Sequence, residues 1–496
     1  MKELQRLVKI IDKNASASSP LINFQDESTL EYKLFHLLKN NSVDSDEAVA
    51  KVLYGSEKLT GSYRMLKSRF RRKLYNHLYF LDFAPDAFYS ANKVNYTCLS
   101  LLTEAQALLI SSELKLALKV LEQAMVLATK YENNEIKVLA LEMICSINRD
   151  LSKKRELDKR REELLACYEV QVSEREGFWL YEKMLGGLKV VTSEKLSVLQ
   201  DFPAALARMW ELWKVSKSSK IFFWRHILQI AYLEQQGEYV EVVNAIATTE
   251  RLVKEKKVNT SWYNRKFNAF IEVYALLQSR QYERGLELAE KNIKLFEKYT
   301  ANWFGFMENY VLLAIHDQQY QLAENLLKDV IEGEHLRKLS DSSIERWELY
   351  RRYFVFLEEQ VVGERRQALS FEITAKLLIL PNDKSGFNLA LLVLDVLEKL
   401  SEGALDDLEV QAERVRKYTQ KYLRGEKAER PRLFMRLLLL ALTRQNAREA
   451  REQGQVLLEK LQATPLPGDA FTEVEIVPYE HLWEHVLQLL GQQGRW

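Results

Sequence analysis

One helical-hairpin pattern appears three times between Phe223 and Val330. In each copy, a long helix with periodic apolar residues is followed by a short polar turn, and a tyrosine then opens a second helix. The three turns are Gly237-Glu238-Tyr239, Arg280-Gln281-Tyr282 and Gln318-Gln319-Tyr320. Because a repeated unit of this kind buries its apolar face only against its neighbours, the pattern predicts a stack of helical hairpins.

The positions that follow each tyrosine also repeat. Three residues later come Val242, Gly285 and Ala323, and ten residues later come Thr249, Asn292 and Val330. This spacing resembles the second half of a tetratricopeptide-type repeat, in which small residues let the first helix of the hairpin pack closely against the second. The resemblance implies an all-α fold, an α-solenoid of tetratricopeptide-like hairpins.

Further copies extend the pattern in both directions. Ser112-Glu113-Leu114 is followed by Ala117 and Ala124, Ala447 is followed by Ala450 and Leu457, and a divergent copy near Arg365 carries Ala368 and Ala375. From this series we expect roughly eight or nine hairpins, somewhat longer than the ideal repeat. The low content of helix breakers, 17 Gly and 8 Pro in 496 residues, also favours long helices.

Breaks in the helical pattern divide the chain into three parts. Asp82 to Asn95 contains Pro85 and has no helical pattern, and prolines return after Leu461. Beyond them, Phe471 to Val477 alternates as a strand or an extended arm would, and a short helix is expected from Tyr479 to Leu490. We therefore expect an N-terminal helical domain at residues 1–82, the solenoid at 96–460, and an arm with a terminal helix at 461–496.

The N-terminal domain contains a short helix, a turn at Gly55 and a longer basic helix from about Ser62 to Leu81. The stretches Asp46–Gly55 and Leu66–Leu74 resemble the helix-turn-helix of a bacterial activator family, in which a winged domain precedes tetratricopeptide-like repeats. The resemblance implies DNA binding through residues 62–75, with these cations as contacts: Arg64, Lys67, Arg69, Arg71, Arg72 and Lys73. Two readings stay open, because the chain continues as helix where a wing is expected, and a run of cations is also typical of a solvated helix face.

The charge, the cysteines and the apolar runs of the chain limit which other classes of protein are compatible with it. Lys and Arg total 71 against 70 Asp and Glu, so any nucleic-acid binding depends on a local patch. Cys98, Cys145 and Cys167 form no C-x-x-C pair, which favours a reducing compartment over a disulfide framework. The N-terminus has no secretory pattern, and the longest apolar run, Leu437 to Leu442, is too short to span a membrane. We expect a cytoplasmic protein without a membrane segment.

No motif in the sequence predicts an enzyme or a cofactor site. His481-Leu482-Trp483-Glu484-His485 matches H-x-x-E-H, but a zinc site needs a third ligand, and none of the eleven residues after His485 is His, Cys, Asp or Glu. There is no phosphate-binding glycine loop and no nucleophile elbow. The aromatic cluster is expected to pack in the core: Trp210, Trp213, Phe222, Phe223 and Trp224.

The sequence therefore favours a non-enzymatic interaction scaffold that binds a protein partner on its solenoid surface. The groove residues would come from the first helices of the hairpins: Asn268, Glu272, Asn309 and Leu313. Self-assembly into a homo-oligomer is a related expectation. The alternative is a DNA-binding transcriptional regulator, with the N-terminal helices on DNA and the repeats as a sensor or oligomerisation domain.

Overall fold

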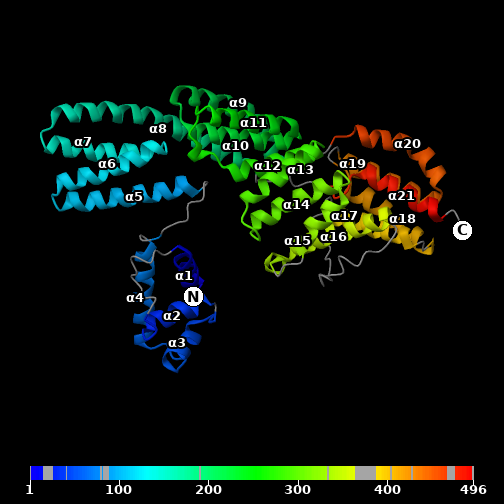
Figure 1. Cartoon of the computed structure of the whole chain (residues 1–496), viewed down its shortest axis with the longest axis horizontal. Helices are drawn as coiled ribbons and strands as arrows, with labels where there is room; N and C mark the ends of the chain where they lie inside the picture. Colours follow the sequence, from blue (N-terminus) through cyan, green and yellow to red (C-terminus); the bar gives the residue numbers. More distant parts are fainter. Residues whose placement is uncertain are drawn as a thin grey trace. The chain divides into compact units, whose positions relative to one another are not determined.

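In the computed structural model the described residues are 2–14, 26–40, 42–78, 81, 89–188, 192–331, 335–362, 387–402, 405–425, 428–465 and 475–493. Every regular element in these ranges is a helix, which confirms the all-α prediction (Figure 1). The chain divides into two compact units, Met1–Val172 and Ser173–Trp496. The expected hairpin near Arg365 and the alternating stretch from Phe471 to residue 474 lie outside the described residues. No helix in the described ranges is long and apolar enough to cross a membrane.

The first unit begins with four helices that share an apolar core. They are α1 (Lys2–Asn14), α2 (Leu30–Lys39), α3 (Asp46–Tyr54) and α4 (Gly61–His77). Phe35 of α2, Val49 of α3 and Phe70 of α4 are almost completely buried in this core. Gly55 ends α3 with a φ of 73°, and the Thr60 side chain accepts a hydrogen bond from the Tyr63 amide at the start of α4. The basic helix is thus present, but α4 ends at His77.

Three further helices follow in the first unit, and a fourth contains the boundary between the units. They are α5 (Tyr89–Ile110), α6 (Leu114–Lys130), α7 (Asn134–Asp150) and α8 (Lys154–Leu188). α6 packs against both α5 and α7, around buried residues such as Leu121 and Leu141. The predicted domain limits near residues 82 and 96 flank the start of α5 at Tyr89, and the three-part division stays a prediction.

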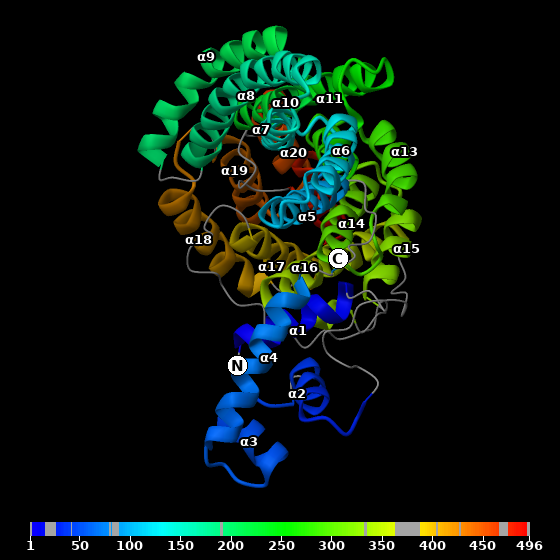
Figure 2. The same cartoon turned by 90° about the vertical axis from the view of Figure 1, so that its left-hand side faces the viewer.

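The second unit is a run of helices in which each packs against its neighbours in sequence. Its first half contains α9 (Thr192–Ser216), α10 (Ser219–Gln236), α11 (Tyr239–Lys254), α12 (Arg265–Gln278), α13 (Tyr282–Asn292), α14 (Ala301–His316) and α15 (Tyr320–Ile331). Its second half contains α16 (Asp341–Val362), α17 (Phe387–Glu402), α18 (Leu405–Tyr422), α19 (Glu429–Arg444), α20 (Ala447–Ala463) and α21 (Tyr479–Gln493). The second helices of three hairpins, α11, α13 and α15, follow one another along one side of this unit (Figure 2).

Four of the predicted hairpin turns have the same backbone geometry. Their first residues have left-handed φ angles: Ser112 61°, Gly237 76°, Arg280 59° and Gln318 58°. The next amide in each turn donates to the carbonyl five residues earlier: Glu113 to Leu108 (2.9 Å), Glu238 to Leu233 (3.0 Å), Gln281 to Leu276 (2.9 Å) and Gln319 to Ala314 (2.8 Å). This is the Schellman type of helix ending, which satisfies carbonyls at the end of the first helix. The equivalence of these turns, expected from sequence, is therefore present in the backbone.

Residues at the third position after the turn are buried where the second helix of a hairpin packs against its neighbours. Ala117, Val242 and Ala323 are completely buried. A Cβ atom at Gly285 would lie 2.6 Å from Cδ2 of Leu313, so α13 and α14 approach too closely there for any side chain without repacking.

The expected C-terminal helix is present as α21 and belongs to the core of the second unit. It packs against α17, α19 and α20, with Trp483 only 1% exposed. An ion pair and a hydrogen bond also join residues 475–480 to the region of α12–α14, much earlier in the sequence. Arg280 pairs with Glu480 at 3.2 Å, and the His316 imidazole lies 2.6 Å from the Glu475 carbonyl oxygen.

Candidate functional site

A pocket of about 410 Å³ lies between α9 and α11, with α10 as its floor. α10 packs against both of these helices (Figure 1). The lining residues are Ala207 and Trp210 of α9, Phe222, Arg225, His226 and Gln229 of α10, and Glu241, Asn244, Ala245, Thr248, Thr249 and Leu252 of α11. Its volume is within the usual range for small-ligand sites, and its lining combines five apolar residues with seven polar ones.

Arg225 is the charged residue on the floor of this pocket. Its Nε donates to the Leu206 carbonyl at 3.2 Å, and its Nη1 donates to Oε1 of Gln229 at 3.0 Å. The guanidinium carbon lies 4.9 Å from the centroid of the Trp210 ring, a cation–π distance. Among the described residues, no carboxylate lies within ion-pair distance of Arg225, and its Nη2 makes no hydrogen bond. Burial lowers the pKa of Arg225, but an arginine stays protonated at any physiological pH.

His226, the next residue on α10, belongs to a buried polar chain that crosses three helices. Its Nε2 lies 2.6 Å from Oδ1 of Asn268, and its Nδ1 lies 3.0 Å from Oγ1 of Thr249. The Asn268 amide nitrogen donates to the Asn264 carbonyl at 2.8 Å, so Oδ1 of Asn268 is an acceptor and Nε2 of His226 carries the proton. Nδ1 is then unprotonated and accepts from the Thr249 hydroxyl.

These hydrogen bonds use both ring nitrogens of His226 and keep the imidazole neutral. Burial lowers the pKa of His226 to about 4, although the hydrogen bond with Asn268 opposes the shift. The imidazole therefore supports the pocket floor and has no free polar atom to offer a ligand.

One charged residue besides Arg225 lines the pocket, and another lies close to the ring of Trp210. Glu241 is exposed and accepts a hydrogen bond from the side-chain amide of Asn244 at 3.2 Å. Lys214 of α9 is also exposed, and its Nζ lies 5.7 Å from the centroid of the Trp210 ring. Arg225 thus has no ion pair with any residue that the structure describes, whereas the carboxylate of Glu241 is exposed to solvent.

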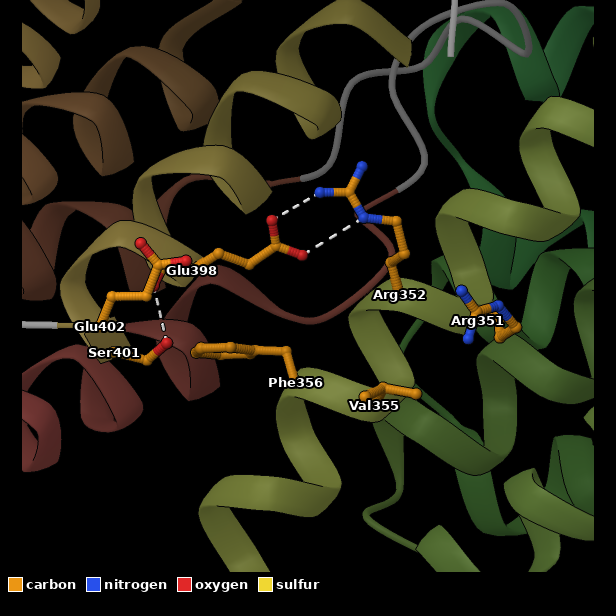
Figure 3. Close-up of a pocket in the computed structure, with 7 residues that line it drawn as sticks. All are labelled: Arg351, Arg352, Val355, Phe356, Glu398, Ser401 and Glu402. Carbon is orange, nitrogen blue, oxygen red and sulfur yellow. Dashed lines mark hydrogen bonds and ion pairs between the residues drawn. The ribbon is translucent and has the colours of Figure 1, made fainter. Parts of the chain in front are cut away.

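A second pocket, of about 440 Å³, lies between α16 and α17, and its arginines are paired with carboxylates (Figure 3). Two arginines line it, and the Arg352 guanidinium faces the Glu398 carboxylate, with hydrogen bonds of 3.2 and 2.5 Å. Arg351 donates to both carboxylate oxygens of Glu348, at 2.8 and 2.7 Å. Because both cations already hold carboxylates, this pocket has no free positive charge, and the α9–α11 pocket is the stronger candidate site.

The four residues predicted to line a groove are largely buried. Leu313 is 0% exposed, Asn268 3% and Asn309 7%, and the Glu272 side chain is 12% exposed. Asn268 holds His226 from the neighbouring helix, and Leu313 packs against Gly285. Glu272, which lies 3.6 Å from Arg284, keeps the most accessible side chain of the four. The groove along the first helices remains a prediction.

Acidic residues neutralise most of the cations on α4. Lys67 pairs with Asp46 at 2.7 Å, Arg71 with Glu3 at 3.0 Å, and Arg69 and Lys73 both pair with Glu31, at 2.8 and 2.5 Å. Arg64 and Arg72 are exposed, and neither has an ion pair with any residue that the structure describes. Two of the six predicted DNA contacts are therefore cations without an ion pair among the described residues.

The two histidines of the H-x-x-E-H match lie on α21 within the second unit. Nε2 of His481 is 3.3 Å from the side-chain nitrogen of Gln318, and burial lowers the pKa of both His481 and His485. In the described part of the chain, no group of three His, Cys, Asp or Glu residues is placed to hold a metal ion.

The aromatic cluster has two environments. Phe222 and Phe223 are buried, in a cluster with Val258, as expected for core residues. Trp210 and Phe222, however, also line the α9–α11 pocket.

Sequence reasoning missed Arg225 as a site residue. A usable signal was that this arginine lies within a largely apolar stretch, Phe222-Phe223-Trp224-Arg225-His226-Ile227-Leu228.

Comparisons with known proteins assign no relative to this chain. No protein-family model, no curated protein and no solved structure matches it.

Proposed function

We propose that this protein is a non-enzymatic scaffold that binds a protein partner on a surface built from tetratricopeptide-like hairpins. The observation that supports this function most directly is the shared turn geometry at Ser112, Gly237, Arg280 and Gln318. In each hairpin an equivalent turn joins the two helices, and hairpins of the same shape stack in a regular way. Such stacks form extended surfaces that bind peptides and other subunits.

Because the predicted groove residues are largely buried, most of them are poor contact positions for a partner. Leu313 and Asn309 stabilise the hairpins from inside, so they offer little area to a partner. Glu272 is the most accessible of the four, and its pKa is raised by burial and by the charge of Glu250. A partner with a basic group at this position would relieve that repulsion.

Photo-crosslinking in the native cell tests this function. A photoreactive phenylalanine analogue replaces Glu272 on α12 in one variant and the exposed Glu287 on the second helix α13 in a control variant. We expect a discrete product with another protein at position 272 but not at position 287, and the same product when the two purified proteins are mixed. Equal products at both positions, or none at position 272, would contradict binding along the first helices.

A DNA-binding regulator is the second candidate function. The observation that favours it is the α3–Gly55–α4 arrangement, in which the Arg64 and Arg72 side chains are exposed and have no ion pair with a described residue. The four ion pairs on the same helix reduce the charge available for phosphate contacts. This makes DNA binding the weaker of the two proposals.

A further inference from the structure

Among the residues that the structure describes, no carboxylate pairs with the Arg225 guanidinium in this pocket. Elsewhere in the second unit, the two arginines of the α16–α17 pocket each hold a carboxylate through two hydrogen bonds. Arg225 instead has a carbonyl, an amide oxygen and an aromatic ring as neighbours, all of them uncharged. A partly buried cation without a counter-charge is costly, and an anionic ligand that reaches it is correspondingly stabilised.

We propose that the α9–α11 pocket is a binding site for a carboxylate, with Arg225 as the residue that receives it. The planar guanidinium matches a carboxylate through two parallel N–H···O bonds, and Nη2 of Arg225 has no other hydrogen bond among the described residues. The Leu206 carbonyl and Gln229 fix the position of the guanidinium before any ligand arrives, which lowers the entropy cost of binding.

The remaining lining restricts the size and charge of the ligand. The walls contributed by Trp210, Phe222 and Leu252 are apolar, so the group that carries the carboxylate has an apolar part. Glu241 in the lining repels a ligand with more than one negative charge. A monocarboxylate with an aliphatic or aromatic side chain therefore fits better than a phosphate.

Two sources supply this chemistry: a small free organic acid and the C-terminal end of a polypeptide. The pocket is formed by α9, α10 and α11, whereas the predicted groove residues lie on α12 and α14. The site therefore stands independently of the proposed scaffold function, and either proposal can fail without the other.

Isothermal titration calorimetry on the full-length protein tests the site with defined probes. These are N-acetyl-L-leucine, its uncharged analogue N-acetyl-L-leucinamide, benzoate, inorganic phosphate, and N-acetyl-Ala-Ala-Ala-Leu with a free carboxylate. We expect the monocarboxylates to bind at least about tenfold more tightly than the amide, which lacks the charge and the second acceptor oxygen that pair with Arg225. They should also bind more tightly than phosphate, because Glu241 in the lining repels its additional negative charge. A tetrapeptide about tenfold tighter than N-acetyl-L-leucine identifies a chain end as the source, and equal affinities identify a free acid.

Three variants connect the binding to the pocket. Arg225→Gln should weaken carboxylate binding by about tenfold or more. Ala207→Trp, at an exposed position on the pocket wall, should block binding while every polar lining group is kept. The matched control for Arg225→Gln is Arg208→Gln on α9, since Arg208 already pairs with Glu176 at 2.6 Å and does not line the pocket, and this variant should bind as the wild type does.

Several results would overturn the proposal. These are equal affinity for the amide and the carboxylate, preference for phosphate, unchanged binding in both Arg225→Gln and Ala207→Trp, or no binding of any monocarboxylate. Circular dichroism of each variant shows whether the helices are intact. If Arg225→Gln does not fold, Ala207→Trp decides alone.

Discussion

The guanidinium of Arg430 holds both carboxylate oxygens of Glu475, at 2.6 and 2.9 Å, with side-chain exposures of only 1% and 7%. Arg430 also reaches Glu480 and the carbonyl oxygens of Leu461 and Thr464, at 2.7 and 3.0 Å. Burial lowers the pKa of Arg430, but its bonds to the two glutamates outweigh burial and raise it overall. The cation is thus fully satisfied inside the protein, and it holds the segment before α21 against α19 and α20.

Removing one partner of this pair is expected to destabilise the second unit. Arg430→Gln leaves the Glu475 carboxylate buried without a counter-charge, which costs about 3 to 5 kcal/mol. The control is Arg451→Gln, because Arg451 and Glu484 form an exposed pair between α20 and α21, with exposures of 61% and 49%, and exposed pairs contribute about 0 to 1 kcal/mol. Urea unfolding of both variants measures the difference. Equal free energies of unfolding would show that the buried pair does not hold α21 in place.

The shared turn gives a prediction with an internal control. Ser112 has a left-handed φ of 61° without being glycine, so Ser112→Gly should raise the free energy of unfolding by about 1 kcal/mol. Gly237→Ala at the equivalent turn should lower it by a similar amount, because φ is 76° there. Ser111→Gly, one residue before Ser112 and outside the left-handed region, should not stabilise the protein. Thermal unfolding of the three variants checks the prediction, and a gain from Ser111→Gly as large as that from Ser112→Gly would contradict it.

The sequence predicts the helices and their turns because both depend on local interactions. A turn followed by an aromatic residue identified the hairpins at Gly237, Arg280 and Gln318 correctly. Equivalent turns begin at Glu132 and Ser152, where the amides of Asn133 and Lys153 donate to carbonyls five residues earlier, but no aromatic residue follows them. The backbone geometry therefore recurs where the side-chain signature does not.

The candidate site depends on contacts that no local pattern contains. Asn268 was expected to face a groove, yet its partner His226 lies 42 residues away on another helix. Glu31 pairs with Arg69 and Lys73, which lie 38 and 42 residues later in the sequence. A run of cations is visible in one sequence, whereas the acids that pair with them become neighbours only after folding.

The ion pairs on α4 limit how strongly DNA binding can depend on salt. Each phosphate neutralised on duplex DNA contributes about −0.9 to the slope of log K against log salt concentration, so Arg64 and Arg72 together support a slope of about −2. Six free cations would support a slope of about −5. Fluorescence anisotropy with a random duplex at several salt concentrations measures the slope. The variant Arg64→Glu with Arg72→Glu should abolish any binding, and a slope near −5 in the wild type would mean that DNA displaces Glu31, Asp46 and Glu3.

Two buried histidines make the second unit sensitive to acid. Burial lowers the pKa of His226 and of His316 to about 4, against an ordinary value of 6.5. The unfolded chain therefore binds more protons than the folded one between pH 6.5 and 4, so stability is complete above pH 6.5 and falls as the pH approaches 4. Each histidine contributes roughly 3 kcal/mol to this loss. Glu234 acts in the opposite direction, because burial raises its pKa to about 7 and its protonation favours the folded state as the pH falls.

His226→Gln isolates one of these groups. Relative to wild type, this variant should lose roughly 3 kcal/mol less between pH 7 and pH 4, because glutamine does not titrate. Thr249→Val is the control: it breaks the hydrogen bond to Nδ1 but keeps the buried imidazole, so it should lower stability by a similar amount at each pH. Urea unfolding at pH 7, 5.5 and 4 gives the free energy of unfolding of each protein at each pH. Parallel pH profiles for wild type and His226→Gln would show that His226 has the same pKa in the folded and the unfolded protein, and that burial beside Thr249 and Asn268 does not lower it.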